Sequence, residues 1–298
     1  MKNFLFIMTI TAIILCTCFN APLITEGCRS GLSLWYSAII PVLLPFMLIA
    51  GVIINTLNTD GLRRISAYTI TLIIGLMCGF PTGTIAASYF YNNGLLHKTD
   101  AQTILPLCNN VSPMFLYGYI YSSYLKYSIT LPALLLCIYA PQLIFTAAVL
   151  ILRHVLQTTD NISDNAATAL SEASAGLSHS YHSIITGSIH NITVIGVYMV
   201  IFSIASQFIL HYIPGEIPVI FTAFLEISNG VPMIQSLNIP IHAKTALTIS
   251  LTSFGGVSAI FQSMEMIHES GLSFTKYITG KLLCGISCAS FALFYLCR

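Results

Sequence analysis

Three stretches of this 298-residue chain run for about twenty residues without a charged side chain: Leu34–Thr56, Leu131–Leu152 and Ile192–Leu210. A fourth stretch of similar length, Leu272–Leu296, carries two lysines. A helix needs about 20 predominantly apolar residues to cross the hydrocarbon core of a bilayer, so each stretch predicts a membrane span. The core of a bilayer contains no water that could bond to unpaired backbone N–H and C=O groups. These stretches must therefore form helices, which satisfy their own backbone hydrogen bonds.

The composition agrees with a membrane protein and excludes other classes. Hydrophobic residues make up 56% of the chain and charged residues 7%, whereas a typical soluble domain has about 25% charged residues. Disorder requires low hydrophobicity, and nucleic-acid binding requires a basic surface that a net charge of +1 does not supply. We therefore expect an all-α polytopic membrane protein whose partners are the lipid bilayer and a small-molecule substrate, with no nucleic acid.

The first apolar stretch, Phe4–Cys18, follows Lys2 and has two interpretations. It resembles the core of a signal peptide, but no convincing small-x-small cleavage motif follows it, so we expect a first membrane helix. At this stage the sequence leaves open whether residues 1–20 are a retained helix or a cleaved signal.

The nine cysteines predict packing rather than chemistry. Eight of them lie in apolar stretches or at their ends, and no Cys/His pair has the spacing of a zinc site. The chain also lacks Gly-x-Ser-x-Gly, His-Glu-x-x-His, Walker and dinucleotide-binding motifs. We therefore expect no catalytic residue, no metal, no organic cofactor and no enzymatic activity.

Between the full spans lie shorter apolar stretches that turn-forming residues interrupt. Ile65–Cys78 and Thr84–Tyr91 flank a Gly-Phe-Pro-Thr-Gly turn, and each arm is about half a membrane long at ~1.5 Å per residue. This pattern predicts a re-entrant helical hairpin. Ala101–Leu107 and Met114–Tyr121 flank the sequence Cys-Asn-Asn-Val-Ser-Pro, which predicts one span broken near its middle.

The pattern recurs in the second half of the chain. Ile217–Leu225 and Val231–Ile239 flank the sequence Glu-Ile-Ser-Asn-Gly and predict a second hairpin. Ala243–Leu251 and Val257–Ile267 flank a Ser-Phe-Gly-Gly sequence and predict a second broken span.

A constant offset relates the two halves, since 230 − 83 and 256 − 109 both equal 147 and place Gly83 on Gly230 and Asn109 on Gly256. Each half contains span, hairpin, broken span and span, which makes three crossings. Because three is odd, the second half is predicted to be inverted relative to the first. We expect an N-terminal transmembrane helix at 1–30, a first repeat at 31–156, a polar linker at 157–180 and a second, inverted repeat at 181–298.

The basic residues predict the orientation. With the N-terminus inside, the cytoplasmic set is Lys2, Arg63, Arg64, Lys98, Arg153, Lys276 and Lys281, and the external set is Arg29, Lys126, Lys244 and Arg298. The excess of cytoplasmic charges favours this orientation. It also leaves no lysine or arginine inside the membrane, so an anionic solute would depend on helix dipoles and hydroxyl groups.

Discontinuous helices at corresponding positions of inverted repeats indicate a transporter site at the midplane of the membrane. The candidate substrate-binding residues are Thr82, Thr84, Asn109, Asn110, Ser112, Glu226, Ser228, Asn229, Ser253 and Ser258. The candidate hairpin-tip and helix-break residues are Gly79, Pro81, Gly83, Pro113, Gly230, Gly255 and Gly256. The competing interpretation is that the Ser, Thr and Asn side chains cap broken helix ends or join neighbouring helices.

Glu226 is the strongest single candidate, because a carboxylate among apolar residues near the middle of a bilayer is costly unless it is paired or protonated. It is a candidate to bind a coupling cation or to carry a proton, so Na⁺ and H⁺ are the candidate coupling ions. The alternative is a structural acid that bonds to the backbone of the opposing hairpin.

The tips and breaks together resemble a known family. Gly79–Gly83, the Asn110–Phe115 break, Leu225–Gly230 and Phe254–Ser258 look like the sporulation integral membrane proteins of YlbJ type. Those proteins carry the nucleoside-recognition gate domain and are distantly similar to concentrative nucleoside transporters. The resemblance covers roughly Gly31–Leu296 in the same order, and this chain departs from the family in its shorter length and in Ser-Pro where members tend to have Asn-Pro.

The resemblance implies a multi-pass protein of the bacterial cell membrane that acts in spore formation, at the mother-cell/forespore membrane, and exports dipicolinate. If a dianion is the cargo, Glu226 is expected to be protonated or partnered by a cation when the solute is bound. The alternatives are a nucleoside or nucleobase permease and a non-transporting sporulation membrane scaffold. Assembly into a homo-oligomer stays open.

Overall fold

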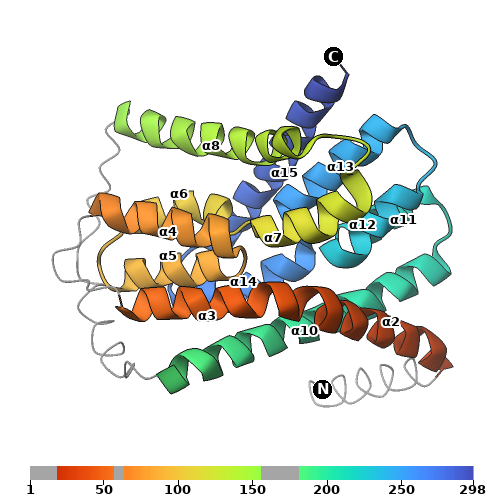
Figure 1. The fold of residues 1–298 in the computed structure, drawn as a ribbon, viewed down its shortest axis with the longest axis horizontal. Helices are drawn as coiled ribbons and strands as arrows, with labels where there is room; N and C mark the ends of the chain where they lie inside the picture. Colours follow the sequence, from red (N-terminus) through yellow and green to blue (C-terminus); the bar gives the residue numbers. More distant parts are fainter. Residues whose placement is uncertain (1–18, 57–63, 156–180, 298) are drawn as a thin grey trace, which may run out of the picture.

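The computed structural model describes residues 19–56, 64–155 and 181–297, and every element within these ranges is a helix (Figure 1). The predicted helix over Phe4–Cys18 and the polar linker at 157–180 lie outside these ranges. In order, the elements are α2 (Ala21–Leu34), the π-helical turn η1 (Trp35–Ile39), α3 (Ile40–Thr56), α4 (Arg64–Cys78), α5 (Thr82–Asn92), α6 (Lys98–Cys108), α7 (Pro113–Phe115), the π-helical η2 (Leu116–Leu125), α8 (Leu131–Val155), α10 (Tyr181–Tyr212), α11 (Glu216–Ala223), α12 (Ile227–Ser236), α13 (Ile241–Phe254), α14 (Gly256–Glu269) and α15 (Phe274–Leu296).

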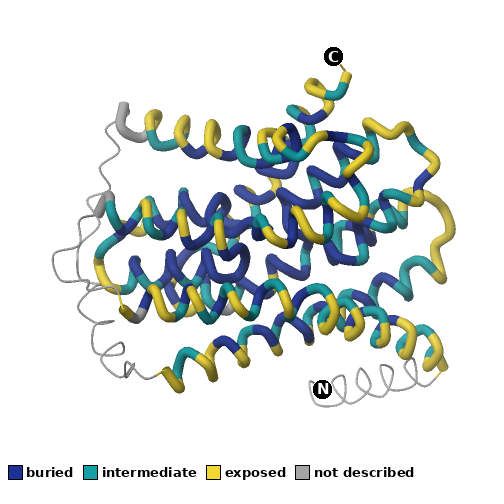
Figure 2. The backbone as a smooth tube through the Cα atoms, in the orientation of Figure 1, coloured by how far each residue is buried: buried dark blue, intermediate teal, exposed yellow. Residues whose placement is uncertain are grey.

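Four helices of the described chain are long and apolar enough to cross a membrane: Ala21–Ile54, Leu131–Leu152, Tyr181–Tyr212 and Phe274–Leu296. Large apolar side chains face outward along them, as Ile144, Ile189 and Ile286 do. Buried residues instead gather on the shorter helices between them (Figure 2). An apolar exterior around a buried centre is what a bilayer requires, so the prediction of an all-α membrane protein is confirmed.

The first long helix begins at Ala21, earlier than the span expected from Leu34, and continues through η1 into α3. The apolar pattern does not reveal this beginning because α2 carries exposed polar residues such as Glu26 and Arg29. Its buried residues are two glycines one turn apart, Gly27 and Gly31.

These two glycines allow α2 to lie directly against α10, which runs antiparallel to it (Figure 1). A Cβ atom on Gly27 would lie 2.6 Å from the Cα of Ile204, and one on Gly31 would lie 2.8 Å from the Cα of Val200. Small residues spaced by one turn permit this close backbone approach between membrane helices.

The shorter helices follow the same order in both halves: two antiparallel helices, then two shorter segments separated by a break, then a long helix. In the first half these are the α4–α5 pair, α6 with α7 and η2, and α8; in the second half they are the α11–α12 pair, α13 with α14, and α15. Figure 1 places the α4–α5 pair and the α11–α12 pair on opposite sides of the molecule, at the left and at the right of the view.

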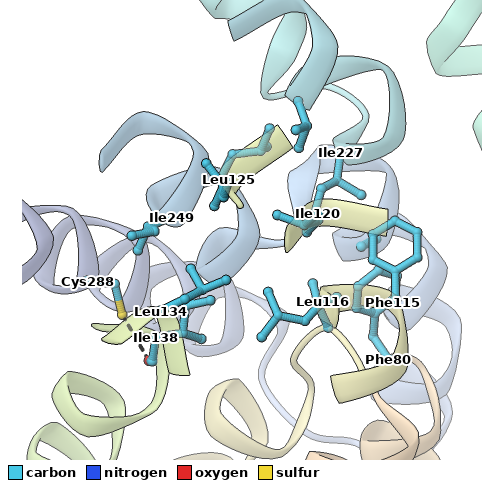
Figure 3. Packing of buried hydrophobic residues seen from close by; sticks show 14 of the residues in the cluster. Phe80, Phe115, Leu116, Ile120, Leu125, Leu134, Ile138, Ile227, Ile249 and Cys288 are labelled. Carbon is cyan, nitrogen blue, oxygen red and sulfur yellow. Dashed lines mark hydrogen bonds between the residues drawn. The ribbon is translucent and has the colours of Figure 1, made fainter. Parts of the chain in front are cut away.

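One apolar cluster joins these parts at the centre. Phe80, from the turn between α4 and α5, packs in the same cluster as Phe115 and Leu116 of the first break and Ile227 of α12 (Figure 3). All four side chains are at least nine-tenths buried. The turn of the first helix pair and the start of α12 are therefore fixed to the same core, which positions the polar residues described below.

We expect Gly31→Ala to lower the melting temperature of the detergent-solubilised protein by several degrees. Its new methyl group would overlap the α10 backbone, and overpacking of this kind costs about 1–3 kcal/mol of unfolding free energy. Gly187→Ala on α10 is the control, because a Cβ atom there meets nothing within 4 Å and alanine favours a helix over glycine by about 1 kcal/mol. Equal melting temperatures for the two variants would show that α2 does not pack on α10 in this way.

Candidate functional site

The turn between α4 and α5 packs against the break between α6 and α7. The backbone N–H of Phe80 donates to the carbonyl of Asn110 at 2.7 Å. Gly83 faces the same break so closely that a Cβ atom would lie 2.0 Å from the carbonyl oxygen of Cys108. Ser112 caps α7, since its Oγ accepts from the backbone N–H of Phe115 at 3.3 Å. The helix-capping interpretation of Ser112 is therefore confirmed.

The α11–α12 pair closes on the break between α13 and α14 in a similar way. The backbone N–H of Val257 donates to the carbonyl of Phe224 at 2.9 Å, and that of Ser258 donates to Leu225 at 2.8 Å. Gly255 and Gly256 adopt positive φ angles of 92° and 81°, which only glycine accepts readily. Backbone groups freed by both breaks thus find partners on the helix pairs.

Glu226 is 2% exposed and lies where this second helix pair turns. Its Oε2 accepts from the backbone N–H of Asn229 at 2.9 Å, so the carboxylate caps the N-terminus of α12. The alternative considered for Glu226 was a structural acid bonded to the opposing hairpin; the bond observed is to the first turn of its own helix. The hydroxyl of Tyr119 donates to the carbonyl of Ser228, which joins η2 to this turn.

Asn229 is half-buried and joins two long helices to the same turn. Its Nδ2 donates to the Oγ of Ser203 on α10 at 2.7 Å, and its Oδ1 accepts from the Oγ of Ser30 on α2 at 3.0 Å. The structure therefore gives Asn229 the role of joining helices, which was the competing interpretation for this residue type.

The two asparagines of the first break form a second polar group with α8, α14 and α15. Asn109 donates through Nδ2 to the Oγ of Ser263 at 2.7 Å and to the hydroxyl of Tyr277. Asn110 donates through Nδ2 to the carbonyl of Leu107 at 3.0 Å and to the Oε1 of Gln142 at 2.6 Å. Both asparagines are 1% exposed, so the break is a closed and largely bonded polar centre.

Lys281 belongs to this group and corrects the predicted charge distribution. Its side chain is 1% exposed, and Nζ donates to the carbonyl of Asn109 and to the Oδ1 of Asn110, both at 3.1 Å. The prediction that Lys281 is a surface charge at the cytoplasmic end is wrong, because its side chain is buried inside the protein. The available signal was its depth: it lies about two turns inside α15 and precedes the apolar stretch Leu282–Cys284.

Several buried polar atoms of these groups have no hydrogen-bond partner, although such atoms are normally bonded in folded proteins. They are Thr84 Oγ1, Asn109 Oδ1, Gln142 Nε2, Ser228 Oγ, Ser253 Oγ and Gln262 Oε1. Four of these six residues are predicted substrate-binding residues. The hydroxyl groups of two further predicted substrate-binding residues are bonded. Thr82 donates to the carbonyl of Gly79, and Ser258 Oγ accepts from Gln262 Nε2 at 3.0 Å.

The glycine pair lies between the two polar groups. A Cβ atom on Gly255 would lie 4.0 Å from the Nζ of Lys281, and one on Gly256 would lie 3.6 Å from the Cα of Glu226. The Lys281 side chain and the Glu226 backbone therefore lie next to adjacent residues of the second break. A displacement of that break would change the surroundings of both residues.

A cleft of about 150 Å³ lies between α3, α5 and α10. Thr82 lines it together with Ser188, Asn191 and apolar residues of α3. The cleft thus reaches the start of α5, next to the first turn, and the other predicted substrate-binding residues do not line it. Within the described ranges no group of three or more His, Cys, Asp or Glu residues could hold a metal ion.

Comparison with known proteins yields one distant similarity that covers most of the chain. The chain is 18% identical over 314 aligned positions to the sporulation integral membrane protein YlbJ of Bacillus subtilis (strain 168), covering 90% of this chain and 76% of that protein. No family model matches the chain. No solved structure matches it either. The expected resemblance to proteins of YlbJ type is confirmed at this level, and the nucleoside-recognition gate domain stays a prediction.

We expect Gly83→Ala to destabilise the protein more than Gly118→Ala, because its methyl group would push the first turn away from the Cys108 carbonyl. The loss should reach or exceed the ~1–3 kcal/mol typical of overpacking, since the overlap involves backbone. At Gly118, on η2, a Cβ atom meets nothing within 4 Å. Thermal unfolding of both variants measures the difference, and an unchanged melting temperature for Gly83→Ala would contradict the docking of this turn on the break.

Proposed function

We propose that this chain is a multi-pass permease of the bacterial cell membrane that moves a small polar, anionic solute and performs no covalent chemistry. The observation that carries the proposal is that both helix-pair turns close on helix breaks by backbone hydrogen bonds. Phe80 bonds to Asn110 in the first half, and Ser258 bonds to Leu225 in the second. Breaks covered by protein in this way are typical of transporters that bind their solute at the midplane.

The architecture of the proposal is an inverted repeat with two re-entrant hairpins. Helices α5 and α11 have 11 and 8 residues, which is too short to cross a membrane at ~1.5 Å per residue. Each therefore pairs with its neighbour to enter and leave the membrane on one side. The opposite placement of the two pairs in Figure 1 supports an inversion of the second half.

The mechanism we propose is movement of the two hairpins and broken helices against the long helices. Each turn rests on its break through one or two backbone bonds, so exchange of these bonds for bonds to water or solute opens the polar centre to one side. Glu226 would bind the coupling Na⁺ or H⁺, since it is a buried acid at the second hairpin tip.

Similarity to a sporulation integral membrane protein supports a role in spore formation at the mother-cell/forespore membrane. Dipicolinate is the solute that the family resemblance suggests. Its negative charge suits the buried Lys281 beside the first break.

The test is solute uptake by the purified protein in liposomes, with imposed Na⁺ or pH gradients and with labelled dipicolinate and a panel of nucleosides. Saturable dipicolinate flux would support the proposal. Flux of nucleosides alone would replace it with a nucleoside permease. No flux of either solute, from protein shown to be folded by its thermal unfolding, would favour a sporulation membrane scaffold.

We expect Glu226→Gln to fold normally and to lose gradient-driven flux. Glutamine keeps a side-chain oxygen that accepts from the N–H of Asn229, so the cap of α12 persists, but the charge that binds the coupling ion is gone. Glu216→Gln is the matched control, because Glu216 is exposed at the start of the neighbouring helix α11. Unchanged coupling in Glu226→Gln would exclude a charge role for this residue.

A further inference from the structure

We propose that the cleft between α3, α5 and α10 is the passage by which the transported solute reaches the first turn, and that it holds a solute of one six-membered ring. This inference rests on the proposed permease function and deepens it, because it names a site on the solute's path and the size class of the solute.

The volume of the cleft limits what it can hold. It is about 150 Å³, and an engineered cavity of roughly this volume in another protein binds benzene. A nucleoside adds a ribose to its base, so its sugar would have to lie outside the cleft. The space therefore suits a solute of the size of dipicolinate better than one of the size of a nucleoside.

The walls of the cleft differ in polarity. Helix α3 contributes apolar side chains such as Met47 and Ile54, whereas α5 contributes Thr82 and α10 contributes Ser188 and Asn191. Ser188 is only 6% exposed. Within the described ranges, its hydroxyl and the Asn191 amide make no hydrogen bond, so both are available to a molecule in the cleft.

This lining favours a polar solute over the acyl chain of a lipid. A planar ring with polar groups along one edge can bond to the α10 side and pack its face against α3. An acyl chain would cover the Ser188 hydroxyl and the Asn191 amide without bonding to them, which is costly for buried polar groups.

The inner end of the cleft is the N-terminus of α5, since Thr82 is the first residue of that helix. None of the residues that line the cleft is charged. A helix N-terminus carries a partial positive charge, so it favours a carboxylate without a nearby cation. The same turn contains Phe80, which bonds to Asn110 of the first break. The cleft thus leads to the turn that covers the polar centre.

The long helices hold the two helix pairs differently. The second turn bonds to both α10 and α2, because Asn229 donates to Ser203 and accepts from Ser30. At the first turn, the Thr82 hydroxyl donates to Gly79 of the same turn rather than to α3 or α10. The structure is therefore open beside the first pair and closed beside the second, which fits one end state of alternating access.

The first test fills the cleft. Gly187→Leu is expected to reduce dipicolinate flux into liposomes by about tenfold or more, because its side chain takes up space that a ring of this size needs. Gly187 lines the cleft, and a Cβ atom on it meets nothing within 4 Å, so the variant should fold. Gly118→Leu is the matched control, since a Cβ atom there also meets nothing within 4 Å and Gly118 does not line the cleft. It should transport as the unaltered protein does.

The second test distinguishes water from lipid in the cleft. Asn191→Cys and Ile189→Cys, in the full chain in nanodiscs, are treated with a water-soluble methanethiosulfonate. Ile189 lies two residues from Asn191 on α10 and is 51% exposed on its outer face. Helix α10 has no native cysteine, so mass spectrometry of its peptides reads each position separately. Position 191 should react, position 189 should not, and dipicolinate should slow the reaction at 191 at lower concentrations than uridine does.

The outcomes separate this passage from the permease function. Undiminished flux in Gly187→Leu, or an unreactive thiol at position 191, would overturn the passage and leave the permease function intact. Equal reaction at positions 191 and 189 would do the same. Protection by uridine as strong as that by dipicolinate would overturn the size class. Absence of dipicolinate flux in the unaltered protein would overturn the anionic solute of the proposed function, and the passage with it.

Discussion

The structure depends on one constraint: a helix that is interrupted in the interior of the protein frees backbone N–H and C=O groups that must find partners there. The protein meets this constraint twice by docking the turn of a helix pair on the break. Phe80 donates to Asn110 at the first break, and at the second break Val257 and Ser258 donate to the turn that follows α11. The glycines that permit these approaches, Gly83 and Gly256, follow from the same requirement.

This arrangement connects the fold to function. A break that is closed by a few bonds between separate helices can exchange those bonds for others, whereas an uninterrupted helix cannot. The polar residues at the breaks are closely packed, yet several of their atoms have no partner. In the permease that we propose, this closed polar centre is the solute site, and Lys281 lies buried beside it.

Much of this organisation could be predicted from the sequence, because the length of an apolar stretch reports directly on how much membrane a helix crosses. The interruption at Gly79–Gly83 and the break at Asn109 follow from that rule, as does the long helix at Leu131. The start of the first long helix could not be predicted, since α2 is held by two glycines against α10 rather than by an apolar stretch. That contact is tertiary and has no local signature.

The candidate site, too, could be predicted only in part. Residue type and position identified Glu226, Asn109 and Asn110 as buried polar groups, and all three are buried. Their partners depend on packing between distant segments, so the cap that Glu226 forms and the burial of Lys281 could not be derived. The count of basic residues assigned Lys281 to the membrane surface, because such a count does not consider how far inside a helix each residue lies.

The central claim is that the two breaks are closed by bonds that open in the working protein. Hydrogen–deuterium exchange of the nanodisc-embedded protein tests it most directly, in the peptides that contain the amides of Phe80, Val257 and Ser258. The account predicts that these amides exchange much faster than amides in the middle of α15 and that dipicolinate slows them. Equal protection of both sets, with and without the solute, would contradict it.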